Sequence, residues 1–405
     1  MEGFTELVLR PAAAPVGYEY DDTDMDSEWV RTPSEDTFTG DDEIEIDPYG
    51  DLLLHVGRDP ESGEGTAYRV CSNALRRASP FWRRTIAETA AEMGAADEED
   101  WDWTPSLYAC QRGKSDGLVV LLNIIHSRFG MVPKRPTLPE VYSVLCLASM
   151  YEMEDVLHPW LGQWYEVIEE AESSRDGRDM ARLVCIAWGL GDERLFVDTV
   201  VKIALTCILN DEGHIVTEDG VCLDEYLYDS LGSPAISGEK RSIPMFVMRP
   251  FNTDNVPEKI RSLRNQMAED LPSHINRLIA RLIDGKWMCQ GISNIPITKN
   301  KKCDYVVLGS LFAGMIYVRG SQATELRIRT EESVADMLVS IKRVLSCVSC
   351  YEKHPDCNPA DRLAEAMRRT IEETDTSLTT AAKESMRERR RRIGIDAFTS
   401  REDDG

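Results

Sequence analysis

Six residues in the last third of the chain have the types and spacing that could bind a metal. They are Cys289, Cys303, Cys347, Cys350, His354 and Cys357. Cys347 and Cys350 are separated by two residues, as are His354 and Cys357. Structural zinc sites use four Cys or His ligands in tetrahedral geometry, often as one close pair from each of two places. These residues therefore predict a structural zinc site, with a core position at the end of an apolar helix as the alternative for Cys347.

The remaining polar residues form no catalytic pattern. Gly189 and Gly191 lack the third glycine of a dinucleotide-binding turn and follow a helical pattern instead of a strand. The sequence contains no phosphate-binding loop, nucleophile elbow or zinc-protease motif. His55, His126 and His158 lie beside apolar residues, where a lone histidine is more often structural than catalytic. We expect no catalytic residue, and a protein that is not an enzyme.

The chain is strongly acidic, and the acidic residues are unevenly distributed. Its formal net charge is -25, and residues 1–49 contain 15 acidic side chains against Arg10 and Arg31. Such a segment, with no apolar period, cannot bury enough surface to offset its ordering entropy. We therefore predict a disordered acidic arm over residues 1–47. Because the negative charge repels a phosphate backbone, we expect no nucleic-acid partner.

Targeting signals are few. No apolar run of about 18 residues occurs, and the N-terminus lacks the pattern of a secretory signal, so we expect no membrane partner. We therefore expect an intracellular protein whose cysteines are reduced. The basic run Arg389 to Arg392 suits a nuclear localisation signal or an acidic partner, and its alternative is a solvated helix end. Nucleus and cytoplasm both remain open as locations.

The first half of the chain alternates between strand and helix patterns. Residues 52–56 and 68–71 predict a hairpin, and Ser72 is a natural N-cap for the helical run that continues to Ile86. The Ser79-Pro80 pair should divide that run into two short helices, because proline disfavours helix in the preceding residue. Trp101 to Trp103 alternates like a third strand.

Helical patterns dominate the rest. Asp116 should cap a helix that reaches Phe129 and stops at Pro133 and Pro136. Further helices are predicted over residues 138–151, 156–164, 181–209 with a break at 189–191, 260–282, 335–348 and 360–371. Residues 211–255 are rich in Gly, Pro, Asp and Ser and predict an irregular insertion. The apolar run 304–317 fits either helix or strand.

Tryptophans offer a different kind of site. Trp101, Trp103, Trp160 and Trp164 are half of the eight tryptophans and lie in one part of the chain. An exposed tryptophan would suit an interface anchor, but large aromatic residues at periodic positions usually pack in a core. We expect core packing for most of them.

The order of these elements resembles that of the BTB/POZ domain in its fungal form. The resemblance rests on residues 50–57, 68–72, 75–82, 121–129 and 151–160. These segments span about 115 residues, little more than a quarter of the chain. Residues 187–196 also look like the helical segment that follows the domain in such proteins.

The resemblance implies a small sheet flanked by helical hairpins, used for association with other proteins, including self-association and docking onto cullin-type ubiquitin ligase scaffolds. The acidic arm takes the place of the N-terminal helix and strand that many animal members exchange, which argues against a swapped homodimer. Ile86-Ala87-Glu88 fits, one position late, the apolar-x-Glu pattern of cullin-binding members, so Ile86 and Glu88 are partner-contact candidates. The resemblance also favours Cys289, Cys303, His354 and Cys357 as the zinc set.

The sequence thus predicts an α+β protein: a BTB/POZ-like domain over 48–168, a mostly helical C-terminal region over 175–372 and a charged, disordered tail over 373–405. Its function is expected to be that of a nonenzymatic adaptor for other proteins. Two alternatives stay open: a substrate receptor of a cullin-type ligase, and a zinc-dependent regulator or enzyme centred on the C-terminal Cys and His residues.

Overall fold

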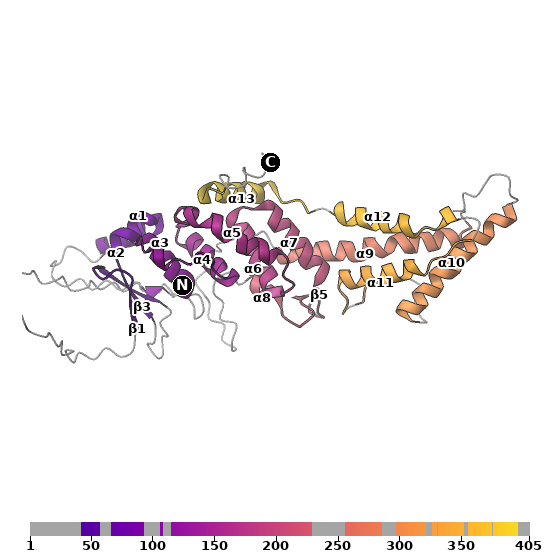
Figure 1. Cartoon of the computed structure of the whole chain (residues 1–405), viewed down its shortest axis with the longest axis horizontal. Helices are drawn as coiled ribbons and strands as arrows, with labels where there is room; N and C mark the ends of the chain where they lie inside the picture. Colours follow the sequence, from indigo (N-terminus) through magenta and orange to yellow (C-terminus); the bar gives the residue numbers. More distant parts are fainter. Residues whose placement is uncertain are drawn as a thin grey trace, which may run out of the picture.

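The protein is mixed α+β and mostly helical, with a four-stranded sheet at one end of an elongated molecule (Figure 1). The computed structural model describes residues 42–56, 66–92, 106–107, 115–228, 256–285, 297–320, 326–329, 331–351, 355–374 and 376–395. Within these residues, no helix combines the length and the apolar character needed to cross a membrane.

The sheet has the strand order β1-β3-β2-β4. Its strands are β1 (Asp42–Glu45), β2 (Leu52–Val56), β3 (Thr66–Val70) and β4 (Ser106–Leu107). β2 and β3 pair antiparallel, which confirms the predicted hairpin, and β4 pairs parallel with β2. The strand predicted at Trp101 to Trp103 lies outside the described residues.

Strand β1 lies where the acidic composition predicts a disordered arm. It pairs parallel with β3, and Arg69 Nε lies 2.7 Å from Glu43 Oε1. Ile46, directly after the strand, is buried. Backbone hydrogen bonds to an existing strand edge can order such a segment although its own sequence has no apolar period. A strand therefore does precede Gly50, contrary to the expectation, while residues 1–41 lie outside the described part.

The Ser79-Pro80 pair divides two helices as predicted, α1 (Ser72–Ala78) and α2 (Pro80–Glu92). The Ser79 hydroxyl accepts from Trp82 N at 3.0 Å and donates to Tyr151 O at 2.5 Å, so it begins α2 and joins it to a later helix. Ser72 is not the N-cap that we expected. Cys71 holds that position, and Ser72 donates its N–H and hydroxyl to the Asp51 carboxylate, both at 2.6 Å.

The next helices cover the sheet region and lead away from it. They are α3 (Ser115–Ile125), η1 (Phe129–Met131), α4 (Leu138–Met150), η2 (Glu154–Leu157) and α5 (His158–Glu172). α3 ends four residues before the predicted Phe129, because Ser127 adopts a φ of 60° and Arg128 N bonds back to Asn123 O. Phe129 is consequently exposed. The side chain of Asp116, the predicted cap, lies outside the described residues.

Helices α6 (Gly177–Leu190) and α7 (Glu193–Thr206) are separated at Gly191, which confirms the predicted break. Gly191 has a left-handed φ of 70°, and the Asp192 carboxylate accepts from Leu195 N at 2.9 Å to cap α7. The turn therefore carries both a C-cap glycine and an N-cap aspartate.

Part of the predicted irregular insertion is regular. β6 (Ile215–Val216) and α8 (Leu223–Tyr228) lie within it. β6 pairs antiparallel with β5 (Ile208–Leu209), where helix was predicted as far as residue 209 but α7 ends at Thr206. α8 packs against α6 and α9, which gives a short segment with weak propensity its order. Residues 229–255 lie outside the described part.

The far end of the molecule is a group of helices around α9 (Figure 1). They are α9 (Val256–Ile283), α10 (Ile297–Arg319), α11 (Val334–Ser346), η3 (Pro355–Cys357) and α12 (Ala360–Glu372). The apolar run 304–317 is helical. It lacks a helical period because α10 contacts both α9 and α11, while Tyr305 and Tyr317 on the same helix remain exposed.

Residues expected to form a disordered charged tail include helix α13 (Thr380–Ile393). α13 returns to the first half of the chain and packs against α6 and η2 (Figure 1). Ala382, Met386 and Ile393 are buried there. The abundance of charged residues in this segment conceals these three positions, which only a surface far away in sequence can bury.

The buried apolar residues form a continuous cluster from the sheet to the far helices. It includes Leu54 of β2, Trp164 of α5, Trp188 of α6, Met267 of α9 and Met386 of α13. Removing residues 50–165 would therefore uncover apolar side chains of α6 and α13. Point substitutions on the surface are the cleaner way to separate binding from folding.

Candidate functional site

The surface of α1 and α2 carries a hollow lined by arginines. Asn73, Arg76, Arg77 and Arg83 surround a volume of about 380 Å³. Arg83 Nε donates to the backbone carbonyl of Arg76 at 3.2 Å. None of the three arginines forms an ion pair with another described residue, whereas the neighbouring Arg84 pairs with Glu152 at 2.5 Å. This hollow, the arginine hollow, offers uncompensated positive charge on a strongly acidic chain.

The two predicted partner contacts lie on α2 in different environments. Ile86 is 7% exposed and belongs to the core, so it is not available to a partner. Glu88 is exposed. The sequence pattern could not separate them, because both fit one helical turn; the packing of α2 onto the core decides which of the two faces inward.

The predicted zinc ligands at the C-terminal end are only partly described. Cys303 is buried on α10 and Cys357 is half-buried in η3, whereas Cys289 and His354 lie outside the described residues. Ser310 Oγ accepts from Ser349 N at 3.0 Å, so the segment after α11 runs alongside α10. Cys347 is exposed and is not the core residue that we considered as its alternative. The zinc set itself stays a prediction.

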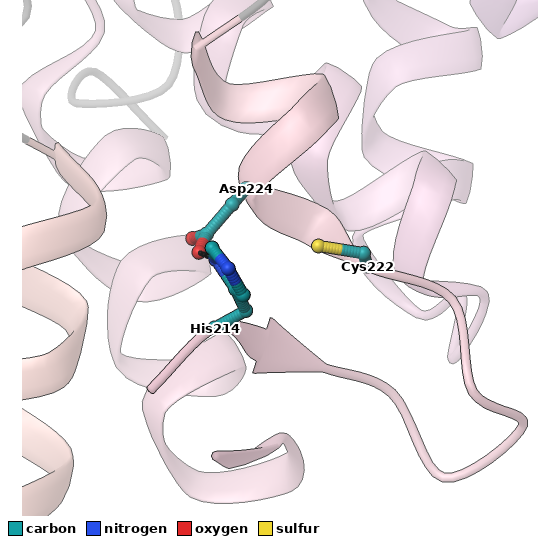
Figure 2. A group of neighbouring side chains, drawn as sticks. All are labelled: His214, Cys222 and Asp224. Carbon is teal, nitrogen blue, oxygen red and sulfur yellow. Dashed lines mark hydrogen bonds and ion pairs between the residues drawn. The ribbon is translucent and has the colours of Figure 1, made fainter. Parts of the chain in front are cut away.

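A second group of potential metal ligands lies between the β5–β6 hairpin and the start of α8. One ligand atom each from His214, Cys222 and Asp224 lies within 4.8 Å of the others. Figure 2 shows the Cys222 sulfur pointing toward the His214 ring and the Asp224 carboxylate. The His214 Nδ1–H donates to Asp224 Oδ2 at 2.8 Å. The three residues lie in the segment that the sequence predicts to be irregular, so no sequence pattern indicates that they come together.

Asp224 is the buried member of this group, at 4% exposed. Its Oδ2 also accepts from Arg261 of α9 at 2.6 Å, and Arg261 Nε donates to Gly213 O at 2.8 Å. Asp224 Oδ1 is buried and has no hydrogen-bond partner in the described part of the chain. One carboxylate oxygen is thus fully used, and the other is buried without a donor.

The basic run Arg389 to Arg392 is not a freely solvated helix end. Arg389 is half-buried and donates to Ser149 Oγ at 3.1 Å, and burial lowers its pKa. Arg391 and Arg392 are exposed and pair with Glu388, both at 3.3 Å. Part of the run therefore holds α13 to α4, and the nuclear signal stays a prediction.

His126 has a structural environment. Its Nδ1–H donates to Leu122 O at 2.8 Å, and its Nε2 accepts from Cys71 N at 2.9 Å. Because a carbonyl only accepts and an amide only donates, both bonds require the neutral ring. Burial lowers the pKa of His126, with smaller contributions from the carbonyl and Asp47, which raise it, and from Arg128 and Arg77, which lower it.

We therefore expect the protein to lose stability as the pH falls below about 6.5. The unfolded chain binds a proton at His126 near its ordinary pKa, whereas the folded chain does so only at lower pH, so stability rises with pH in this window. The contribution of His126 to the change in the free energy of unfolding with pH should not exceed about 1.4 kcal/mol per pH unit. Urea unfolding of the wild type and of His126→Gln across this range checks it; equal slopes in both would contradict the assignment.

Comparison of the chain with protein-family models, with characterised proteins and with solved structures found no match.

Proposed function

We propose that the chain is a nonenzymatic adaptor that binds another protein through a BTB/POZ-like domain over residues 48–168. The arrangement of the β2–β3 hairpin, the α1–α2 pair, β4, α3 and the α4–α5 pair supports it. This is the order in which the sequence resemblance requires a hairpin, two short helices, a strand and further helices.

The arginine hollow is the observation that carries this proposal. Unpaired like charges held close together repel one another, and an acidic ligand relieves that repulsion. Arginine also binds carboxylates bidentately, which adds geometric selectivity. The partner is therefore expected to present an acidic segment to α1 and α2.

Reversing the charge of the hollow should remove the partner. Full-length protein carrying Arg76→Glu and Arg77→Glu is expected to recover at least about tenfold less partner than the wild type in affinity purification from its native cells. Both side chains are exposed, so folding should be retained. Arg281→Glu is the matched control, because Arg281 is likewise an exposed arginine in the last turn of a helix.

The affinity purification has one outcome that supports the adaptor proposal and one that contradicts it. Loss of the same bound proteins in the double variant alone, together with weaker capture at high salt, supports the adaptor proposal. Equal recovery of those proteins from wild type, double variant and Arg281→Glu would contradict it.

A cullin-ligase substrate receptor is the second candidate, favoured by the exposed position of Glu88 at the end of α2. The Glu88→Lys variant should then fail to capture a cullin that the wild type captures. Ile86 should be left unchanged in this test, because a polar residue at a core position would unfold the site instead of testing it. Cullin capture that survives Glu88→Lys would remove Glu88 from the contact.

A further inference from the structure

We infer that His214, Cys222 and Asp224 form a zinc-binding site. The inference is independent of the proposed adaptor function, because the three residues lie in the β5–β6 and α8 segment and not on α1 or α2. They supply one imidazole, one thiol and one carboxylate. This mixed set suits zinc, whereas calcium and magnesium prefer oxygen ligands alone.

The spacing of the ligand atoms fits a zinc ion. Zinc bonds of roughly 2.0–2.3 Å place the ligands of a tetrahedral site about 3.5 Å apart. The three ligand atoms already lie within 4.8 Å of one another. Small side-chain rotations would close them around an ion, and Figure 2 shows the three side chains converging on one space.

The buried carboxylate is the independent sign that a ligand belongs here. Leaving a buried acceptor without a partner is unfavourable, because nothing replaces the water that it loses on folding. Asp224 Oδ1 is such an acceptor, and a zinc ion would satisfy it. Arg261, at 2.6 Å from Oδ2, occupies the other oxygen and holds the carboxylate in place, the role that outer partners play in metal sites.

The His214 ring lies beside the same carboxylate. Its Nδ1 lies 2.8 Å from Asp224 Oδ2. Zinc would bind the neutral imidazole through the ring nitrogen that carries no proton, so the ring would keep its proton and only the Cys222 thiol proton would be released to solvent. The fourth position remains open to water, because the His214 side chain is 46% exposed. Glu212 lies near, with Oε2 at 3.4 Å from His214 Nε2.

A purely structural network is the competing explanation. His214, Asp224 and Arg261 alone would fasten the hairpin to α8 and α9 through one hydrogen bond and one ion pair. That explanation assigns no role to Cys222 and leaves Oδ1 without a donor. It predicts that the sulfur makes no difference to any bound metal.

Cobalt titration of the full-length protein, stripped with a chelator, separates the two. The wild type should bind about one equivalent at this site and show a thiolate-to-cobalt absorption band. Cys222→Ser should remove that band and weaken zinc binding at least about tenfold. His214→Gln should weaken binding similarly, and Cys71→Ser, which changes another half-buried cysteine, should not.

The cysteines of the C-terminal set provide the remaining control. If a second zinc site exists there, Cys357→Ser lowers the total zinc content but leaves the band that depends on Cys222. A cobalt spectrum and zinc content unchanged by Cys222→Ser and His214→Gln, in variants that keep the wild-type circular dichroism, would overturn the inference. So would a wild type that binds no zinc.

Discussion

Replacing Trp164 by alanine is expected to lower the free energy of unfolding by about 3–5 kcal/mol. Trp164 lies in α5, is 0% exposed and belongs to the continuous core. Its Nε1–H donates to the Pro133 carbonyl at 3.0 Å, so the substitution removes a hydrogen bond and leaves a cavity. Urea unfolding followed by circular dichroism measures the change.

Trp160 provides the matched control on the same helix. It is half-buried and contacts the exposed Phe129, with ring centroids 5.9 Å apart. Trp160→Ala should therefore cost only about 1 kcal/mol. Equal costs for the two variants would show that α5 does not pack as the structure has it.

Replacing Gly191 by alanine is expected to detach α13 from α6. A Cβ atom at Gly191 would lie 2.1 Å from Met386 O and 2.9 Å from Arg390 Cβ, both on α13. A backbone oxygen cannot move away unless the whole helix shifts. The left-handed φ of 70° adds strain for any residue with a side chain. Together these effects should cost about 3 kcal/mol or more.

Amide hydrogen exchange over residues 380–393 reports the detachment directly, because an undocked helix of this length exchanges quickly. Gly285→Ala is the control. Gly285 has a nearly identical φ of 69°, but apart from its chain neighbours no heavy atom of a described residue lies within 4 Å of its Cβ position. The Gly285→Ala variant should lose about 1–2 kcal/mol of unfolding free energy through backbone strain, and the amides of α13 should stay protected from exchange. Protected α13 amides in Gly191→Ala would contradict the docking.

Local chemistry explains which elements could be predicted. Pro80 disfavours helix in the preceding Ser79 and suits the first turn of α2. Gly191 with Asp192 supplies a stop and a start within two residues. The amphipathic helices follow in the same way from their apolar periods. α10 shows the limit: it contacts helices on more than one side, so its sequence has no period to read.

Long-range contacts explain what could not be predicted. Acidic β1 is ordered by the edge of β3, and charged α13 by α6 and η2. The candidate zinc site shows the same effect, because a hairpin must fold back before His214 meets Cys222 and Asp224.

The sequence by itself determined the helix breaks, the strand hairpin and an acidic chain that is mostly helical, because each depends on neighbouring residues. The tertiary structure alone decided that Ile86 is core while Glu88 is exposed, and that part of the Arg389 to Arg392 run holds a helix in place. It also placed the three zinc-binding candidates together. These features depend on which distant surface a side chain meets, and that is set only when the whole core packs.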